Sequence, residues 1–255
     1  MWWIAGLAAL ASAAVGIWRT RGANARQRAI MLACWRAGMR FAVLNPFPDL
    51  MWLPFPIFAN ARRPRVTNVV WDRRDDAVRG FDLAVAVAVP LDETAPGIGI
   101  GDTLTMTCAV APLPFTSPGL SIVARGATDP SGIPLVGAEV RLELDTFNRQ
   151  FLVMAADARA ATAFLDQRMM RALLHLPVRA SIHVRERTLL LVLPPRRPAG
   201  EVLLLVQTAK VLARSVPPVT ASLYPPRPEE GPHEDRWLQG SWSADPAGSE
   251  AADAG

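Results

Sequence analysis

Three acidic residues and one histidine in the second half of the chain are suited to acid–base chemistry. Glu143 and Asp145 share one face of a predicted strand, and Asp157 begins the helix that follows. A carboxylate beside a second carboxylate or an imidazole can act as a general acid and base. One alternative is therefore a membrane-tethered hydrolase or transferase that uses Asp157 with Glu143 or His183. Exposed acids are ordinary on a strand, so we assign no catalytic residue and expect no enzyme.

The histidines and cysteines do not have the spacing of a metal site. His175 closes a predicted helix and His183 lies on the polar face of a strand, eight residues later across a proline turn, and His233 is remote from both. No third ligand has zinc-like spacing. Cys34 and Cys108 are unpaired, and Cys108 alternates with apolar residues, which predicts an inward-facing thiol. We therefore expect neither a metal nor a cofactor.

Two other kinds of chemistry find little support. The glycine run of residues 97–101 has no lysine and no following helix, so it does not match a phosphate-binding loop. No serine lies in the sharp strand-to-helix turn that presents a hydrolase nucleophile. The rest of the sequence is informative mainly about architecture.

The periodicity of apolar residues predicts strands followed by helices. An alternation with period two marks strands, and the i, i+3, i+4 spacing after Asp157 and after Pro198 marks amphipathic helices. Runs of strands with helices on one face are typical of an α+β fold with a mainly antiparallel sheet and two packed helices. The predicted strands are residues 81–89, 103–110, 140–144, 151–153, 182–185 and 189–193, with a turn at Glu186-Arg187, and the predicted helices are residues 157–176 and 198–216.

The N-terminal residues predict the location of the protein in the cell. Residues 2–18 carry no charge, and the next ten contain four arginines. As a helix this run would span about 25 Å, near the lower limit for a membrane span. The arginines follow the run, so the positive-inside rule puts the N-terminus outside and the remainder in the cytoplasm. Residues 11–13, Ala-Ser-Ala, leave a cleaved signal peptide as an alternative, although such signals carry their positive charge before the apolar stretch.

Charge and composition divide the chain further. Residues 1–79 hold 12 Arg and 4 acids, a net +8, and residues 219–255 hold 2 Arg and 7 acids, a net −5. A basic segment next to a bilayer is attracted to anionic lipid. The predicted layout is a transmembrane anchor (1–18), a juxtamembrane basic helix (19–40), an apolar connector rich in proline and aromatic residues (41–65), a cytoplasmic α+β domain (66–218) and a disordered acidic tail (219–255).

One block of sequence carries a resemblance to a known family. Asp145-Thr146-Phe147-Asn148-Arg149-Gln150-Phe151, with shorter blocks in order along residues 50–224, resembles actinobacterial-type membrane-anchored proteins of unknown function that have a Phe-Asn-Arg-x-Phe strand turn. The resemblance implies a fold and a membrane address but no catalytic residues. Asn148 suits a turn, and Arg149 can pair with Glu143 or Asp145. Similar proteins often carry a proline where this chain has Gln167, so one continuous helix is expected from Asp157 to Leu176.

The function that follows is a single-pass membrane protein whose cytoplasmic domain is a binding or scaffolding module without catalysis. Its expected partners are the lipid bilayer and another protein, and nucleic acid is not expected. The segment Phe47–Phe58, with Trp52 and Phe55, and the acidic tail are the predicted contact surfaces. A further alternative is a binder of anionic lipid or nucleic acid acting through basic residues of the N-terminal region, Arg62, Arg63, Arg65, Arg73 and Arg74.

Overall fold

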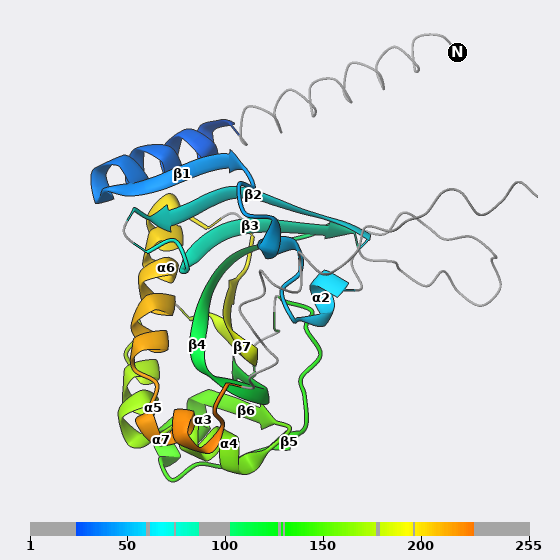
Figure 1. Cartoon of the computed structure of the whole chain (residues 1–255), viewed down its shortest axis with the longest axis vertical. Coiled ribbons are helices and arrows are strands. Elements are labelled where there is room, and N and C mark those ends of the chain that lie inside the picture. The colour runs from blue at the N-terminus through cyan, green and yellow to red at the C-terminus, as the bar shows by residue number, and fades with distance from the viewer. Residues whose placement is uncertain are drawn as a thin grey trace, which may run out of the picture.

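Two long strands, β4 (Thr103–Ala124) and β7 (Ser181–Leu193), pair antiparallel at the centre of the fold (Figure 1). The computed structural model describes residues 24–59, 62–73, 75–86, 103–126, 129, 131–176, 179–195 and 197–226. In that part of the chain the seven strands form one sheet in the order β1-β2-β3-β4-β6-β5, and β7 pairs with β4 off this path. Register shifts between Pro112 and Leu120 interrupt the β4–β7 pairing, and β4 is strongly bent (Figure 1).

The N-terminal part of the described chain contributes three strands to this sheet and a helix that lies beside it. Residues 24–37 are helical, and Gly38, with φ of +69°, turns the chain back into β1. β1 is an edge strand and lies beside this helix at one end of the molecule (Figure 1). The elements are β1 (Met39–Leu44), the 3-10 helix η1 (Pro48–Met51), α2 (Pro56–Ala59), β2 (Arg62–Asp72) and β3 (Arg79–Ala86).

The C-terminal part alternates short elements with one long helix. α6 packs along the sheet, and its Val206 comes so near to β3 that a Cβ on Gly80 would lie 2.5 Å from it. The elements are β5 (Ala138–Glu139), α3 (Asp145–Gln150), β6 (Phe151–Ala155), α4 (Ala158–Phe164), α5 (Gln167–Leu174), α6 (Ala199–Arg214) and α7 (Pro218–Leu223).

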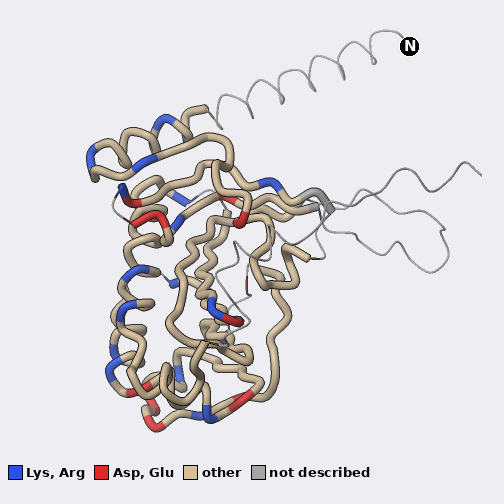
Figure 2. The backbone as a smooth tube through the Cα atoms, in the orientation of Figure 1, with Lys and Arg blue, Asp and Glu red and all other residues tan. Residues whose placement is uncertain are grey.

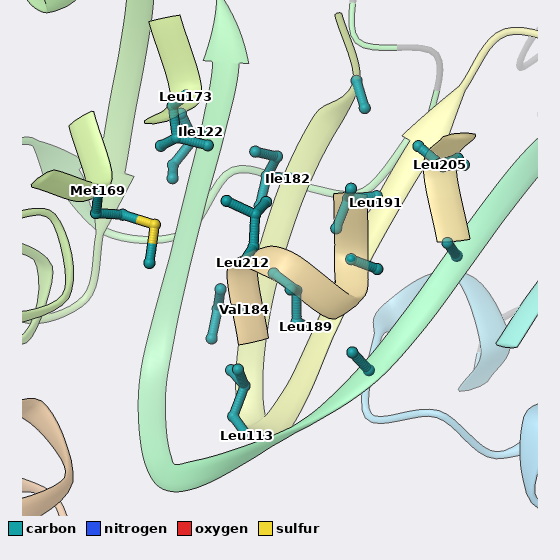
Figure 3. Close-up of a cluster of buried hydrophobic side chains, with 14 of the residues drawn as sticks. Leu113, Ile122, Met169, Leu173, Ile182, Val184, Leu189, Leu191, Leu205 and Leu212 are labelled. Carbon is teal, nitrogen blue, oxygen red and sulfur yellow. The ribbon is translucent and has the colours of Figure 1, made fainter. Parts of the chain in front are cut away.

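The alternation of side chains along the strands divides the buried apolar residues into two clusters, one on each sheet face. On the face covered by α6 and α5, Leu189 and Leu191 of β7 pack with Leu205 and Leu212 (Figure 3). On the other face, the segment from η1 to α2 covers the sheet with three buried residues, Leu50, Phe55 and Phe58. Cys108 belongs to this second cluster and is fully buried, as predicted from its alternation.

Several predicted elements are confirmed. α6 occupies Ala199–Arg214 within the predicted helix 198–216, and β6 begins at Phe151. Asp157 is the N-cap of α4 and accepts a hydrogen bond from the amide of Arg159 at 2.8 Å. His175 is the C-cap of α5, as its place at the end of the helical pattern indicated.

Four predicted features are wrong: a continuous helix, a hairpin, a strand and a turn. The helix 157–176 is broken into α4 and α5, because Asp166 is extended and caps α5 by accepting from the amide of Met169. The predicted hairpin at Glu186-Arg187 does not form, because β7 continues through both residues, with Glu186 at φ of +50°, and the extra residues of the irregular pairing lie on β4. The predicted strand 140–144 and the turn at Asn148-Arg149 are replaced by a two-residue β5 and the short helix α3.

The predicted membrane span also needs correction. Among the residues that the structure describes, no helix is both long and apolar enough to cross a membrane. The predicted span itself, residues 2–18, lies outside those residues, as does most of the predicted tail. The predicted fold class is corrected to α+β with a mainly antiparallel sheet, and the described residues contain no transmembrane helix. The predicted single-pass location, with the N-terminus outside and the domain in the cytoplasm, is corrected in the same way, because no described helix could be its membrane span.

Candidate functional site

The structure does not bring the predicted acid–base residues together. Asp157 accepts hydrogen bonds from the amide of Arg159 and the hydroxyl of Tyr224, while His183 lies on β7 among other polar groups. Glu143 is exposed in the segment before α3. Nothing in the described part of the chain places three or more His, Cys, Asp or Glu side chains where they could hold a metal ion.

His183 instead belongs to a buried polar cluster with Ser121, Asp129 and Ser131. Its Nδ1 lies 3.1 Å from Oγ of Ser121, which is its cross-strand partner on β4. Its Nε2 lies 3.2 Å from Oγ of Ser131 and 3.3 Å from a carboxylate oxygen of Asp129. Since Ser131 donates its own hydrogen to Asp129 at 2.7 Å, Nε2 must be the donor in both contacts.

The carboxylate of Asp129 is held in its ionised form. Burial alone would raise its pKa, but hydrogen bonds from His183 and from the amide and hydroxyl of Ser131 outweigh burial and lower the pKa to about 2. Ser131 Oγ also accepts from the amide of Ile133 at 3.0 Å. The cluster therefore fastens the segment that starts at Asp129 to the centre of the sheet.

The same residue types form catalytic triads elsewhere, but this cluster is closed to substrate. Ser121, Ser131 and His183 are 3%, 0% and 1% exposed. A nucleophile has to reach the reacting atom of its substrate, and neither hydroxyl meets that requirement here. Sequence reasoning missed Ser121, Asp129 and Ser131, because only the pairing of β4 with β7 brings them to His183.

Asp157 has a structural role at the far end of the fold. The hydroxyl of Tyr224 donates to its carboxylate at 2.6 Å, and this bond is the main cause of the lowered pKa of Asp157. The carbonyl of Tyr224 accepts from the amide of Thr116 on β4. These two bonds tie the end of α7 to α4 and to the sheet.

An exposed apolar and basic surface lies at the opposite end of the molecule, on the helix of residues 24–37. The inner side of this helix buries Ile30 and Cys34 against the sheet. Its outer side presents a stripe at the spacing i, i+3, i+4, i+7, with Met31, Leu32 and Trp35 exposed by 52%, 45% and 75%. We call this surface the Arg–Trp face, and it consists of Arg28, Met31, Leu32, Trp35 and Arg36, all exposed.

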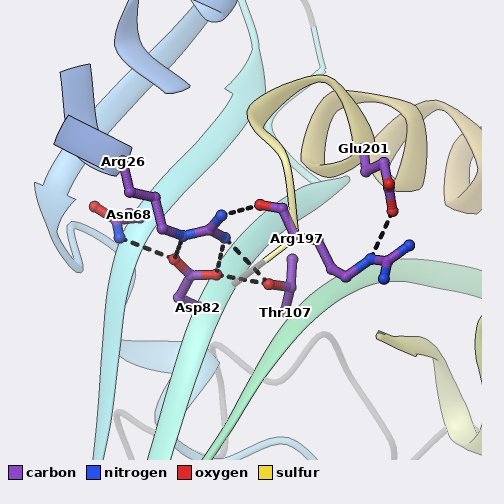
Figure 4. Close-up of polar contacts among 6 residues, drawn as sticks. All are labelled: Arg26, Asn68, Asp82, Thr107, Arg197 and Glu201. Atoms are coloured by element: carbon purple, nitrogen blue, oxygen red, sulfur yellow. Dashed lines mark hydrogen bonds and ion pairs between the residues drawn. The ribbon is translucent and has the colours of Figure 1, made fainter. Parts of the chain in front are cut away.

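Arg26 holds this helix on the sheet from its inner side (Figure 4). Its Nε and Nη2 donate to the two carboxylate oxygens of Asp82 on β3, at 3.1 and 2.8 Å. Asp82 also accepts from Asn68 of β2 and Thr107 of β4, at 2.9 and 2.8 Å. Nη1 of Arg26 donates to the carbonyl of Arg197, just before α6. The helix is therefore fixed in orientation, and its outer side is held toward solvent.

The Arg–Trp face has no acidic neighbour along the chain. The first acidic residue of the sequence is Asp49, so the helix and β1 carry arginine without any carboxylate (Figure 2). Arg40 of β1 is exposed as well. A helix that is apolar on its outer side as well as its inner side has unburied surface available for another molecule.

The predicted contact residues and basic residues differ in their exposure and position. Phe55 is 2% exposed in the second cluster, so the prediction that it contacts a partner is wrong, whereas Trp52 is exposed. Arg65 and Arg73 are both exposed but are eight residues apart along or beyond β2, about 26 Å at the rise of a strand. Arg74 and the side chains of Arg62 and Arg63 lie outside the described part. The two described side chains, Arg65 and Arg73, therefore do not belong to one compact basic cluster.

Comparison with known proteins adds a fold likeness. No family model and no curated protein matches this chain. Among solved structures, the mycobacterial trehalose monomycolate transport factor A, TtfA, is similar, with a TM-score of 0.53 and 13% identity, over 79% of this chain and 97% of that one. At this identity the likeness concerns the fold: this chain has an α+β architecture of the kind found in a transport factor.

Proposed function

We propose that this chain is a non-catalytic binding protein, an accessory factor that engages another molecule through the Arg–Trp face. The observation that carries the proposal is Trp35, a tryptophan left 75% exposed on a helix whose inner side is anchored in the core. Large aromatic residues and arginine are enriched where proteins make energetically important contacts. The neighbouring Met31 and Leu32 extend the same surface.

The fold likeness supports the accessory part of this proposal. The similar solved structure is a transport factor, and such a role requires binding rather than bond-making. The residues that could do chemistry are used structurally, since His183 fastens a buried segment and Asp157 caps α4. The Arg–Trp face is therefore the functional surface in this proposal, and the buried polar cluster stabilises the fold.

Site-specific photo-cross-linking of the full chain in living cells tests the proposal. A photoreactive amino acid replaces Leu32 in one variant and Val211, exposed by 55% on α6, in a matched control. Position 32 is expected to give discrete cross-linked products that position 211 does not give. Equal products, or none, at the two positions would overturn the assignment of this surface.

The same experiment separates binding from catalysis. Ser121→Ala removes the hydroxyl beside Nδ1 of His183 without touching the Arg–Trp face. If the protein acts by binding alone, the products captured from position 32 should be unchanged in this background, once folding has been verified by circular dichroism. Accumulation of a different captured molecule in the Ser121→Ala background would favour an enzyme instead.

A further inference from the structure

We propose that the Arg–Trp face docks on an anionic lipid surface, with the helix of residues 24–37 lying flat along the headgroups. This proposal rests on the proposed function, because it names the class of molecule that the same face would bind. It concerns contact with one leaflet by the outer side of a helix that stays packed on the sheet.

The apolar part of the face has the composition of an interfacial helix. Met31, Leu32 and Trp35 lie within two turns on one side, and all three are at least 45% exposed. A tryptophan ring is favoured at the level of the headgroups, since its apolar body contacts acyl chains while its N–H stays near water. Helices of this kind bury their apolar side to a depth of about 5–10 Å at the boundary between headgroups and chains.

The charged residues of the helix flank this apolar centre and have one sign, and the nearby Asp72, opposite Met39 of β1, is paired with Lys210. Arg28 and Arg36 flank it, about 12 Å apart along the helix at about 1.5 Å per residue. Arg26 is paired with Asp82, but the guanidinium groups at Arg28, Arg36 and Arg40 are exposed, with no acidic residue in the sequence before Asp49. Anionic headgroups would supply the missing negative charge.

The geometry favours a plane over a groove-shaped partner. The helix that bears the stripe lies at one end of the molecule (Figure 1), and its inner side is fastened by Arg26 (Figure 4). A convex, rigid, apolar stripe between two cations fits a flat surface of apolar chains and anionic headgroups. A protein partner would need a complementary acidic groove, and we treat that occupant as an outcome of the test.

A fluorescent reporter on the face can test docking position by position. Leu32→Cys in the full chain is labelled with an environment-sensitive fluorophore, and Val211→Cys is the control. The native thiols should not compete, because Cys34 and Cys108 are buried and burial raises the pKa of Cys34 to about 11. The probes used are phosphatidylcholine vesicles with and without phosphatidylglycerol. We expect a blue shift at position 32, only with phosphatidylglycerol, and none at position 211.

Two pairs of charge variants, each of which lowers the net charge by two, test the role of the arginines. Arg28→Gln/Arg36→Gln removes two cations from the face, and Arg168→Gln/Arg171→Gln removes two exposed cations from α5. At about 5-fold per basic residue at a lipid surface, the first pair should lower partitioning about 30-fold and the second far less. Trp35→Ala should lower it about 10-fold through lost apolar burial.

The outcomes separate this proposal from the one on which it rests. Equal shifts with neutral and anionic vesicles, no shift with either, or an equal effect of the two arginine pairs would each overturn docking on anionic lipid. If the vesicles have no effect while position 32 cross-links a protein in cells, the proposed function stands and its partner is a protein. If both experiments fail, the proposed function fails as well.

Discussion

Arg26 and Asp82 are 56 residues apart in sequence and meet through two hydrogen bonds, at 3.1 and 2.8 Å, between the helix of residues 24–37 and β3. Both side chains are about one-fifth exposed, so the pair is mostly shielded from water. It joins the helix that bears the Arg–Trp face to the three strands whose side chains converge on Asp82.

Replacing Asp82 by Asn should loosen this helix. The variant loses the charge on a carboxylate that pairs with Arg26 and accepts from Thr107, so the free energy of unfolding in urea should fall by about 2 kcal/mol. Amide exchange should accelerate over residues 24–37. The control is Glu139→Gln, which breaks an ion pair with Arg125 in which both side chains are about 40% exposed. This variant should change the free energy of unfolding by less than about 1 kcal/mol. Equal effects of the two variants would contradict the assigned role of Asp82.

The Asp129 carboxylate should make stability depend on acid pH. Its pKa in the folded protein is about 2 against an ordinary value of 3.8. The ionised form therefore stabilises the fold above pH 3.8, and this contribution is lost as the pH falls toward 2. At 1.36 kcal/mol per pKa unit it amounts to about 2 kcal/mol.

Urea unfolding of the wild type and of Asp129→Asn across that range measures the contribution. The free energy of unfolding of the wild type should exceed that of the variant near neutral pH, and this difference should become smaller as the pH falls below 3.8. Glu143→Gln, a change at an exposed acid, serves as the control for general acid effects. A gap that stays constant through this window would show that Asp129 does not titrate as the cluster requires.

Gly137 should tolerate substitution far less than Gly126. Both have positive φ, +83° and +77°, but a Cβ at Gly137 would lie 1.9 Å from the carbonyl oxygen of Ala155 and one at Gly126 would meet nothing within 4 Å. Gly126→Ala should cost about 1 kcal/mol through its backbone conformation alone. Gly137→Ala should cost about 3 kcal/mol or more, because β5 must move away from β6. Similar thermal unfolding temperatures for the two variants would contradict the close approach.

Much of the regular structure could be predicted from local pattern. α6 has a long apolar period bounded by prolines, and Cys108 alternates with apolar residues in a strand, so neither depends on distant contacts. The misses occur where a single residue changes the chain direction. Asp166 ends one helix by capping the next, and Glu186, at φ of +50°, lies inside a continuous strand where the local sequence looks like a turn.

The candidate surface could not be predicted, because its helix is apolar on both sides. Periodicity gives no means of telling whether Ile30 and Cys34 or Met31 and Trp35 face the core. The answer depends on Arg26 finding Asp82, a pairing across 56 residues that sequence spacing does not reveal. Long-range packing likewise decides that Phe55, one of the predicted contact residues, is buried.

The rates at which thiols at positions 32 and 211 react in cells show most directly whether another molecule covers the Arg–Trp face. Leu32→Cys and Val211→Cys are each labelled with a maleimide, once in the purified full chain and once in intact cells with a reagent that enters them. If the Arg–Trp face is a binding surface, the rate at position 32 relative to position 211 should fall several-fold in cells. An unchanged ratio of the two rates would contradict the central claim.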